Sequence, residues 1–273
     1  MKKISCVFFV FILAITLILP AFGQNEAEFS VALNIAGDGV AITGYTGIST
    51  TIRIPATIQG MPVKEIATQA FRNFTPLGDG PAITSVTIPE GVVVIRNAAF
   101  QNCKSLRTIT FPASLRIIES YAFNLCESLN TIEIPEGVSE IQSNAFVDCT
   151  SLKAVKLPKT LTMIKGGTFS GCRSLKNITI PEGITVIEGG FNGCRSLESV
   201  VLPSTISEIH GGSFMNCENL ITVTIPDSVV TIEFTDGRGG VWRSKALNCF
   251  EGCKRLNIAS QSALRKRGYE GVF

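Results

Sequence analysis

The sequence repeats itself about every 23 residues, and this period decides what the chain can fold into. Prolines recur at one repeat position with successive spacings of 23, 23, 23, 23, 22 and 23 residues. They are Pro89, Pro112, Pro135, Pro158, Pro181, Pro203 and Pro226, and Pro55 is an earlier member. Eight phenylalanines mark a second position: Phe71, Phe100, Phe123, Phe146, Phe169, Phe191, Phe214 and Phe250. Such a chain is expected to form a solenoid, because one coil cannot bury its own apolar face and must stack on its neighbours.

The unit that begins at Leu106 reads LRTITFPASLRIIESYAFNLC. Its first residues alternate, so that Ile109 and Phe111 point to one side and Thr108 and Thr110 to the other, which is typical of a half-buried strand. Pro112 is expected to end this strand, because proline has no N–H for the ladder.

A second apolar pair follows three and six residues after each proline, as in Leu115 and Ile118. This pair predicts a short second strand or extended arm on the opposite wall. The A-F-x-x-C segment then turns the chain back, with phenylalanine in the interior. The predicted fold is a β-rich solenoid. It has a parallel sheet of about eight rungs, with short second strands or turns on the opposite wall.

These units resemble the BspA-like leucine-rich repeats of bacterial surface proteins, whose unit is close to C-x-S-L-x-x-I-x-I-P-x-x-V-x-x-I-x-x-x-A-F. The resemblance covers about residues 30–258, and ITGYTGISTTIRIPATIQGMPVKEIATQAF looks like the first rung of that family. It implies a leucine-rich-repeat solenoid. The chain departs from the pattern at residues 73–81, which read NFTPLGDGP, and between Ile232 and Phe250, where about 13 residues are added.

The N-terminal residues are typical of a secretory signal peptide. Lys2 and Lys3 precede an uncharged apolar run from Ile4 to Leu19, and the small-residue site Ala21-Phe22-Gly23 follows. A membrane anchor is the competing interpretation, but the run is shorter than the roughly 20 residues that a span needs. The expected organisation is a signal peptide at 1–23, cap strands at 24–54, eight repeats at 55–258 with an insertion at about 234–248, and a cap or tail at 259–273.

Charge and motifs exclude several classes of function. Without Lys2 and Lys3, the 24 basic residues become 22, which balance the 22 acidic ones. A chain without net charge is not expected to bind nucleic acid or to insert into a membrane after the signal peptide is removed. We find no G-x-S-x-G motif, phosphate loop or metal-ligand spacing. The sequence therefore predicts no catalytic residue, no metal and no cofactor.

Eight cysteines follow the signal segment, an even number that in an exported protein ordinarily indicates disulfides. Their spacing favours a different interpretation, a column of buried thiols, because parallel side chains on stacked rungs fit a disulfide poorly. Seven share one repeat position: Cys103, Cys126, Cys149, Cys172, Cys194, Cys217 and Cys253. Cys249 stands where other units have alanine. A metal site at Cys249 and Cys253 lacks further clustered ligands.

The outward strand positions form three columns that are rich in threonine. A basic cluster of Arg107, Lys153, Lys156 and Lys176 lies among them, with Glu133 beside Lys156. This cluster predicts a ligand-binding surface that prefers an acidic protein, although the charges could equally serve only to keep an exposed sheet soluble.

Two further residues of interest lie outside the columns. Trp242 lies in the insertion, where it is either part of a cap on the last rung or an aromatic anchor for a partner. His210, the single histidine, is expected at an exposed corner without a functional role.

The resemblance implies an exported, non-catalytic protein-binding or adhesion module, expected to be secreted, on the cell surface or in the periplasm. Its partner would be a protein, such as host matrix or another envelope protein, and the chain itself is expected to be a monomer. The alternative is a secreted carbohydrate-active enzyme of the parallel β-helix type. Such an enzyme needs clustered acids on one wall, and Glu133 is the only acid in its column.

Overall fold

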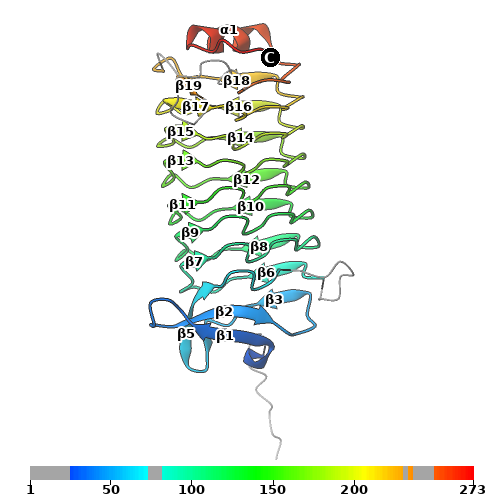
Figure 1. The fold of residues 1–273 in the computed structure, drawn as a ribbon, viewed down its shortest axis with the longest axis vertical. Helices are drawn as coiled ribbons and strands as arrows, with labels where there is room; N and C mark the ends of the chain where they lie inside the picture. Colours follow the sequence, from blue (N-terminus) through cyan, green and yellow to red (C-terminus); the bar gives the residue numbers. More distant parts are fainter. Residues whose placement is uncertain (1–24, 73–81, 230–232, 236–248) are drawn as a thin grey trace, which may run out of the picture.

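The computed structural model of the chain describes residues 25–72, 82–229, 233–235 and 249–273. These residues stack into an elongated β-solenoid of about eight turns, with a group of N-terminal strands at one end and a helix at the other (Figure 1). This architecture confirms the predicted leucine-rich-repeat solenoid.

The front wall consists of the eight short strands that precede the repeat prolines. They are β3 (Thr51–Arg53), β6 (Ser85–Thr87), β8 (Thr108–Thr110), β10 (Thr131–Glu133), β12 (Ala154–Lys156), β14 (Asn177–Thr179), β16 (Ser199–Val201) and β18 (Thr222–Thr224). Neighbouring strands pair in parallel and in register within three sheets, β3-β6-β8, β10-β12 and β14-β16-β18, so that Val86 lies opposite Ile109 and Val200 opposite Val223. One repeat position therefore forms one column along the wall.

The back wall consists of the strands formed around the second apolar pair. They are β5 (Met61–Ile66), β7 (Val94–Ile95), β9 (Ile117–Ile118), β11 (Glu140–Ile141), β13 (Met163–Ile164), β15 (Val186–Ile187), β17 (Glu208–His210) and β19 (Glu233–Thr235). The second strand was expected, and its parallel pairing confirms it. Residues 234 and 235 had been assigned to the insertion, but they pair with β17. Residues 236–248, which include Trp242, lie outside the described residues.

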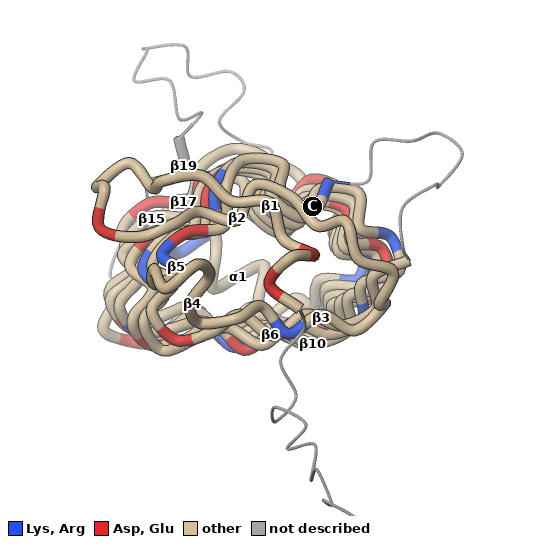
Figure 2. Tube along the Cα trace, turned by 90° about the horizontal axis from the view of Figure 1, so that it is seen from below, with Lys and Arg blue, Asp and Glu red and all other residues tan. Residues whose placement is uncertain are grey.

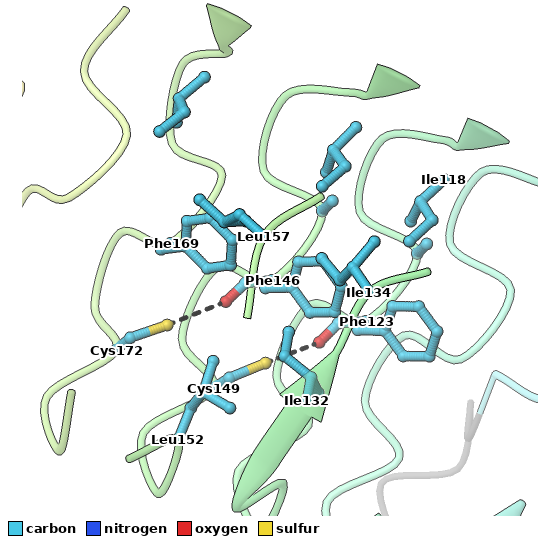
Figure 3. Close-up of a cluster of buried hydrophobic side chains, with 14 of the residues drawn as sticks. Ile118, Phe123, Ile132, Ile134, Phe146, Cys149, Leu152, Leu157, Phe169 and Cys172 are labelled. Carbon is cyan, nitrogen blue, oxygen red and sulfur yellow. Dashed lines mark hydrogen bonds between the residues drawn. The ribbon is translucent and has the colours of Figure 1, made fainter. Parts of the chain in front are cut away.

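The eight repeat phenylalanines form one column through the core. Neighbouring rings stack with centroids 4.8–5.7 Å apart and planes inclined by 5–12°. Figure 3 shows three of them, Phe123, Phe146 and Phe169, in adjacent turns. At the C-terminal end the ring of Tyr269 packs edge-on against Phe250, with centroids 5.3 Å apart. Each ring thus fills the space that its neighbours leave, as the sequence predicted.

Each end of the stack has its own closing elements. A 3-10 helix (Glu26–Glu28) leads into β1 (Phe29–Leu33), which pairs antiparallel with β2 (Val40–Tyr45). Strand β2 pairs in parallel with β5, which also pairs with β4 (Thr57–Ile58), so the back wall continues into this end.

Helix α1 (Ile258–Lys266) closes the other end. The side chain of Asn257 accepts a hydrogen bond from the Ser260 backbone N–H, which caps the start of the helix. The Ser260 hydroxyl in turn accepts one from the Val223 backbone N–H at 3.0 Å, which joins α1 to β18.

Two residues in most turns adopt left-handed backbone angles, a feature that the periodicity did not reveal. They lie on either side of the repeat phenylalanine, as Ala98 (φ 54°) and Asn102 (φ 63°) do around Phe100. The later turns use glycine at these positions, among them Gly167, Gly171, Gly189, Gly193 and Gly212. The reversal at A-F-x-x-C therefore depends on a conformation that L-residues rarely adopt.

Replacing Gly212 by alanine is expected to lower the free energy of unfolding by about 1 kcal/mol. A Cβ added at Gly212 would meet no atom within 4 Å, so its φ of 79° is the only source of the cost. Urea unfolding measures the change. Gly44→Ala is the matched control: its φ is not left-handed, its Cβ would lie 3.6 Å from the Ser30 Cβ, and it should cost nothing. Equal losses in the two variants would contradict this explanation.

The proline corners alternate between two kinds. At the first corner Glu90 accepts hydrogen bonds from the backbone N–H groups of Ala113 and Ser114 in the next turn, at 2.8 and 3.2 Å. The Ser114 hydroxyl accepts one from the Gly91 N–H and donates to the Val92 carbonyl.

Glu136 accepts from the Lys159 N–H in the same way, and Glu182 accepts from the Ser204 N–H. These bonds from Ser204 hold the pKa of Glu182 below its ordinary value. Corners with glutamate thus alternate with corners that lack it.

Candidate functional site

The candidate site is the outer face of the front wall. Along each strand one set of side chains enters the core and the other is exposed, because successive residues of a strand point to opposite sides. In β10 the central Ile132 is buried, whereas Thr131 and Glu133 are exposed. The exposed side chains stand on a backbone that the ladder holds in place.

Three basic side chains occupy one column of this face. Arg107, Lys153 and Lys176 stand directly before β8, β12 and β14, and all three are exposed. Asn130 links the first two turns, since its N–H donates to the Arg107 carbonyl at 3.3 Å and its own carbonyl accepts from the Lys153 N–H at 2.8 Å. Among the described residues, no acidic side chain forms an ion pair with these three.

Lys156 differs from the other basic residues of the predicted cluster because it is paired. It lies directly opposite Glu133 across the β10 and β12 ladder, and their side chains form an ion pair. The hydrogen bond from Lys156 to Glu133 and the negative charge of that carboxylate raise the pKa of Lys156. Both side chains are more than half exposed, so the pair contributes little to stability. It does reduce the positive charge that Lys156 offers to a partner.

The middle column of the face carries small polar side chains that bond to one another. The Thr108 hydroxyl donates to the Ser85 hydroxyl at 2.9 Å, and the Ser199 hydroxyl donates to the Asn177 side-chain oxygen at 2.8 Å. These bonds partly fix the rotamers of the side chains in the column.

The back wall contains an ionic chain that sequence reasoning missed. Arg96 lies 2.9 Å from Glu65 on one side and 2.9 Å from Glu119 on the other, in three successive turns. Partial burial opposes the charged form of Arg96, but its hydrogen bonds to Glu119 and Glu65 raise its pKa overall. Glu65 is almost fully buried, so we interpret the chain as a structural clamp. The sequence did contain a signal for this chain, because Arg96 and Glu119 occupy the same position in successive repeats.

His210 is not at an exposed corner, as the sequence had suggested. It ends β17, its side chain is only 16% exposed, and its Nε2 lies 3.0 Å from a Glu208 carboxylate oxygen. The position equivalent to Arg96 is therefore half-buried in this turn as well, which explains the error.

The cysteines form the buried column that the spacing predicted. All eight cysteines of the described residues are reduced and buried. In seven turns the thiol donates to the carbonyl of the repeat phenylalanine in an earlier turn. Cys149 to Phe123 (3.2 Å) and Cys172 to Phe146 (3.4 Å) are drawn in Figure 3. Burial raises the pKa of the Cys103 thiol to about 12 and that of Cys149 well above its ordinary value.

Within the described ranges no group of three or more histidine, cysteine or acidic side chains is placed to hold a metal ion. Nor does any helix in the described part of the chain have the length and apolar character needed to cross a membrane.

Comparison with known proteins agrees with this geometry. A family profile described as "BspA type Leucine rich repeat region" matches residues 64–190 and 188–235 in 6 copies. No curated protein sequence matches the chain.

Solved structures of leucine-rich repeat proteins are also similar to this chain. The leucine-rich repeat protein of T. pallidum is 27% identical, with 92% of this chain and 99% of that chain covered and a TM-score of 0.63. A leucine-rich repeat protein from Eubacterium ventriosum is 24% identical, with 78% of this chain and 61% of that chain covered and a TM-score of 0.56, which supports the fold.

Proposed function

Because the chain belongs to the BspA-type leucine-rich repeat family, we propose that it is an exported, non-catalytic module that binds another protein. The family suggests a protein-interaction or adhesion module. The finer part of the proposal is that the outer face of the front wall makes the contact.

The exposed column of Arg107, Lys153 and Lys176 carries this proposal. Its side chains stand directly before strands that are paired by backbone hydrogen bonds, so binding orders little besides their rotamers. Solvated basic side chains act mainly by steering an acidic surface and by partial pairing. We therefore expect a protein partner with an acidic patch, a modest affinity and a strong dependence on salt.

The charge distribution on the front wall disfavours the enzyme alternative. Glycoside hydrolysis ordinarily needs two carboxyl groups roughly 5–9.5 Å apart. Glu133 is paired with Lys156, and Glu198 stands three turns further along the wall. Three strand spacings amount to roughly 14 Å. This separation supports a binding role.

Export rests on residues 1–23, which lie outside the described residues and keep the pattern of a signal peptide. We place the mature protein on the cell surface or in the envelope. Protease treatment of intact cells separates the two locations, because a surface protein is degraded and a periplasmic one is protected.

Reversing the charge of Arg107, Lys153 and Lys176 together to glutamate is expected to weaken binding at least about tenfold at low salt. The probes are immobilised extracellular-matrix proteins and the envelope fraction of the expressing cells, with affinity measured at two salt concentrations. None of the three side chains is buried, so the far-ultraviolet spectrum and the unfolding midpoint should not change.

The matched control reverses Lys104, Lys159 and Arg173, which alters the net charge equally but lies in turns that do not adjoin the front-wall strands. It should bind like the native chain. If the front-wall variant retains both affinity and salt dependence, the face is not the site, and the segment around Trp242 becomes the better candidate.

A further inference from the structure

The two ends of the solenoid carry opposite charge. Residues 25–50 contain three acidic side chains, Glu26, Glu28 and Asp38, and no basic one, and with Lys64 of the neighbouring strand β5 this end still has an excess of acid. Figure 2 looks onto this end of the molecule. At the other end, residues 249–273 contain five basic side chains and two acidic ones. The basic residues are Lys254, Arg255, Arg265, Lys266 and Arg267.

Both ends also expose large apolar side chains. Leu33, Ile35 and Ile48 are 67%, 84% and 94% exposed at the N-terminal end. Ile258 and Val272 are 85% and 66% exposed at the C-terminal end. The large apolar side chains exposed along the walls of the described turns reach at most 44%, at Val201. Terminal caps of repeat proteins ordinarily present a polar outer surface, so this distribution is unusual.

The charged groups at the two ends are held in place by the structure. Glu26 accepts a hydrogen bond from the Gln59 N–H at 3.0 Å, and Glu28 accepts one from the Tyr45 hydroxyl at 3.2 Å. At the opposite end the Arg265 guanidinium lies 4.9 Å from the centroid of the Phe273 ring, and Arg267 donates to the Val229 carbonyl at 2.9 Å. Binding at either end would order few additional side chains.

One sheet edge is open at the N-terminal end. Strand β1 is the outermost strand of the back-wall sheet and, among the described strands, pairs only with β2. An unpaired edge offers N–H and C=O groups to another chain. At the C-terminal end helix α1 lies against β18 of the front wall, and β19 is the outermost back-wall strand among the described residues. The two ends are therefore different surfaces. A symmetric contact would join two ends of like charge, whereas a contact between opposite ends joins unlike charges.

We propose that the acidic N-terminal end of one copy docks on the basic C-terminal end of a second copy, so that the molecules associate head to tail. A contact between two different surfaces leaves one end of each open, and so it extends into a linear chain rather than stopping at a dimer. The inference replaces the expectation of a monomer. It goes beyond the proposed function, since the front wall of every copy stays uncovered.

The test uses two variants that each block one end. Ile35→Lys places a positive charge on the acidic N-terminal end, and Ile258→Asp places a negative charge on the basic C-terminal end, at exposed positions where the fold should tolerate it. Val201→Asp introduces a charge on the front wall and serves as the control. Sedimentation velocity of the exported chain is measured over a concentration series at low and high salt.

The native chain and the Val201 control are expected to form species that grow with concentration. Association should weaken at least about tenfold between 0.05 and 0.5 M salt. Each end variant alone should remain monomeric. A one-to-one mixture of Ile35→Lys and Ile258→Asp should form dimers and nothing larger, because only one intact pair of ends remains.

Three results would overturn the proposal: a native chain that stays monomeric at every concentration at low salt, end variants that associate like the native chain, or a mixture that forms no dimer. Circular dichroism of each variant shows whether it is folded. A misfolded Ile258→Asp can be replaced by the double variant Lys254→Glu and Lys266→Glu, for which the same outcomes are expected.

Discussion

Raising the pH above 9 is expected to unfold the protein steeply, with a midpoint at about pH 10–11. The cause is the buried cysteine column. Desolvation raises the pKa of Cys103, Cys249 and Cys253 to about 12, against an ordinary value of 9.0. It also raises the pKa of the other five thiols of the column well above that value.

High pH destabilises the fold because the thiols ionise at a lower pH in the unfolded chain than in the folded one. Below pH 9 the thiols are protonated in both the folded and the unfolded chain, so they do not alter stability with pH. Between pH 9 and 12 they ionise in the unfolded chain but stay neutral in the fold, which favours unfolding. Each thiol costs about 1.4 kcal/mol per pH unit in this window, so eight together cost on the order of 10 kcal/mol by pH 10. A typical domain has about 5–15 kcal/mol of stability.

An alkaline titration under a phosphine reductant measures this effect. Thiolate absorbance near 240 nm and the loss of far-ultraviolet signal should rise together, since the thiols ionise only when the fold opens. Cys249→Ala is the control, because other turns hold alanine at that position, as at Ala99 and Ala122. Its transition should move slightly upward in pH. Thiolate absorbance that appears near pH 9 while the structure persists would contradict the prediction.

Replacing Phe146 by alanine is expected to lower the free energy of unfolding by about 3–5 kcal/mol. The ring is fully buried and stacks on Phe123 and Phe169, with centroids 5.1 and 5.6 Å away. Alanine would leave a cavity in the middle of the column that rigid turns on both sides cannot collapse to fill. Because each turn of a solenoid is stabilised mainly by its neighbours, the unfolding transition should also become broader.

Urea unfolding followed by circular dichroism measures both quantities. The control is Phe111→Ala, since Phe111 is only partly buried and meets the column edge-on at Phe123, with ring centroids 5.7 Å apart. Its loss should be about 1–2 kcal/mol, below the range for full burial. A Phe146 variant that loses no more than the Phe111 variant would show that the stacked column is not the main source of stability.

The regular part of the fold could be predicted because it depends on short-range patterns repeated many times. Alternation around Ile109 gave the front strand, the pair Leu115 and Ile118 gave the back strand, and both place Phe123 and Cys126 inside. Features that occur once gave no such signal. Helix α1 has no counterpart in the repeat, and the left-handed angle at Tyr121 cannot be read from its residue type.

The candidate face could be predicted only as columns of side chains. The repeat spacing placed Lys156 beside Glu133, and the structure shows the ion pair that results. The position of Glu65 between the first turns was missed, because a residue that is ordinarily exposed becomes buried only when Arg96 neutralises it. What the columns recognise depends on the surface of a second molecule, which cannot be inferred from the repeat spacing of one chain.

The alternating proline corners make the pair of turns, and not the single turn, the modular unit of this protein. A glutamate corner accepts hydrogen bonds from N–H groups of the following turn, and a serine or threonine hydroxyl of that turn donates to a carbonyl of the glutamate turn, so these corner bonds close within one pair. Two such turns span 46 residues, from Pro89 to Pro135. An array lengthened or shortened by whole pairs keeps every corner matched. Removing one turn would place two glutamate corners side by side, with like charges facing each other and N–H groups left over.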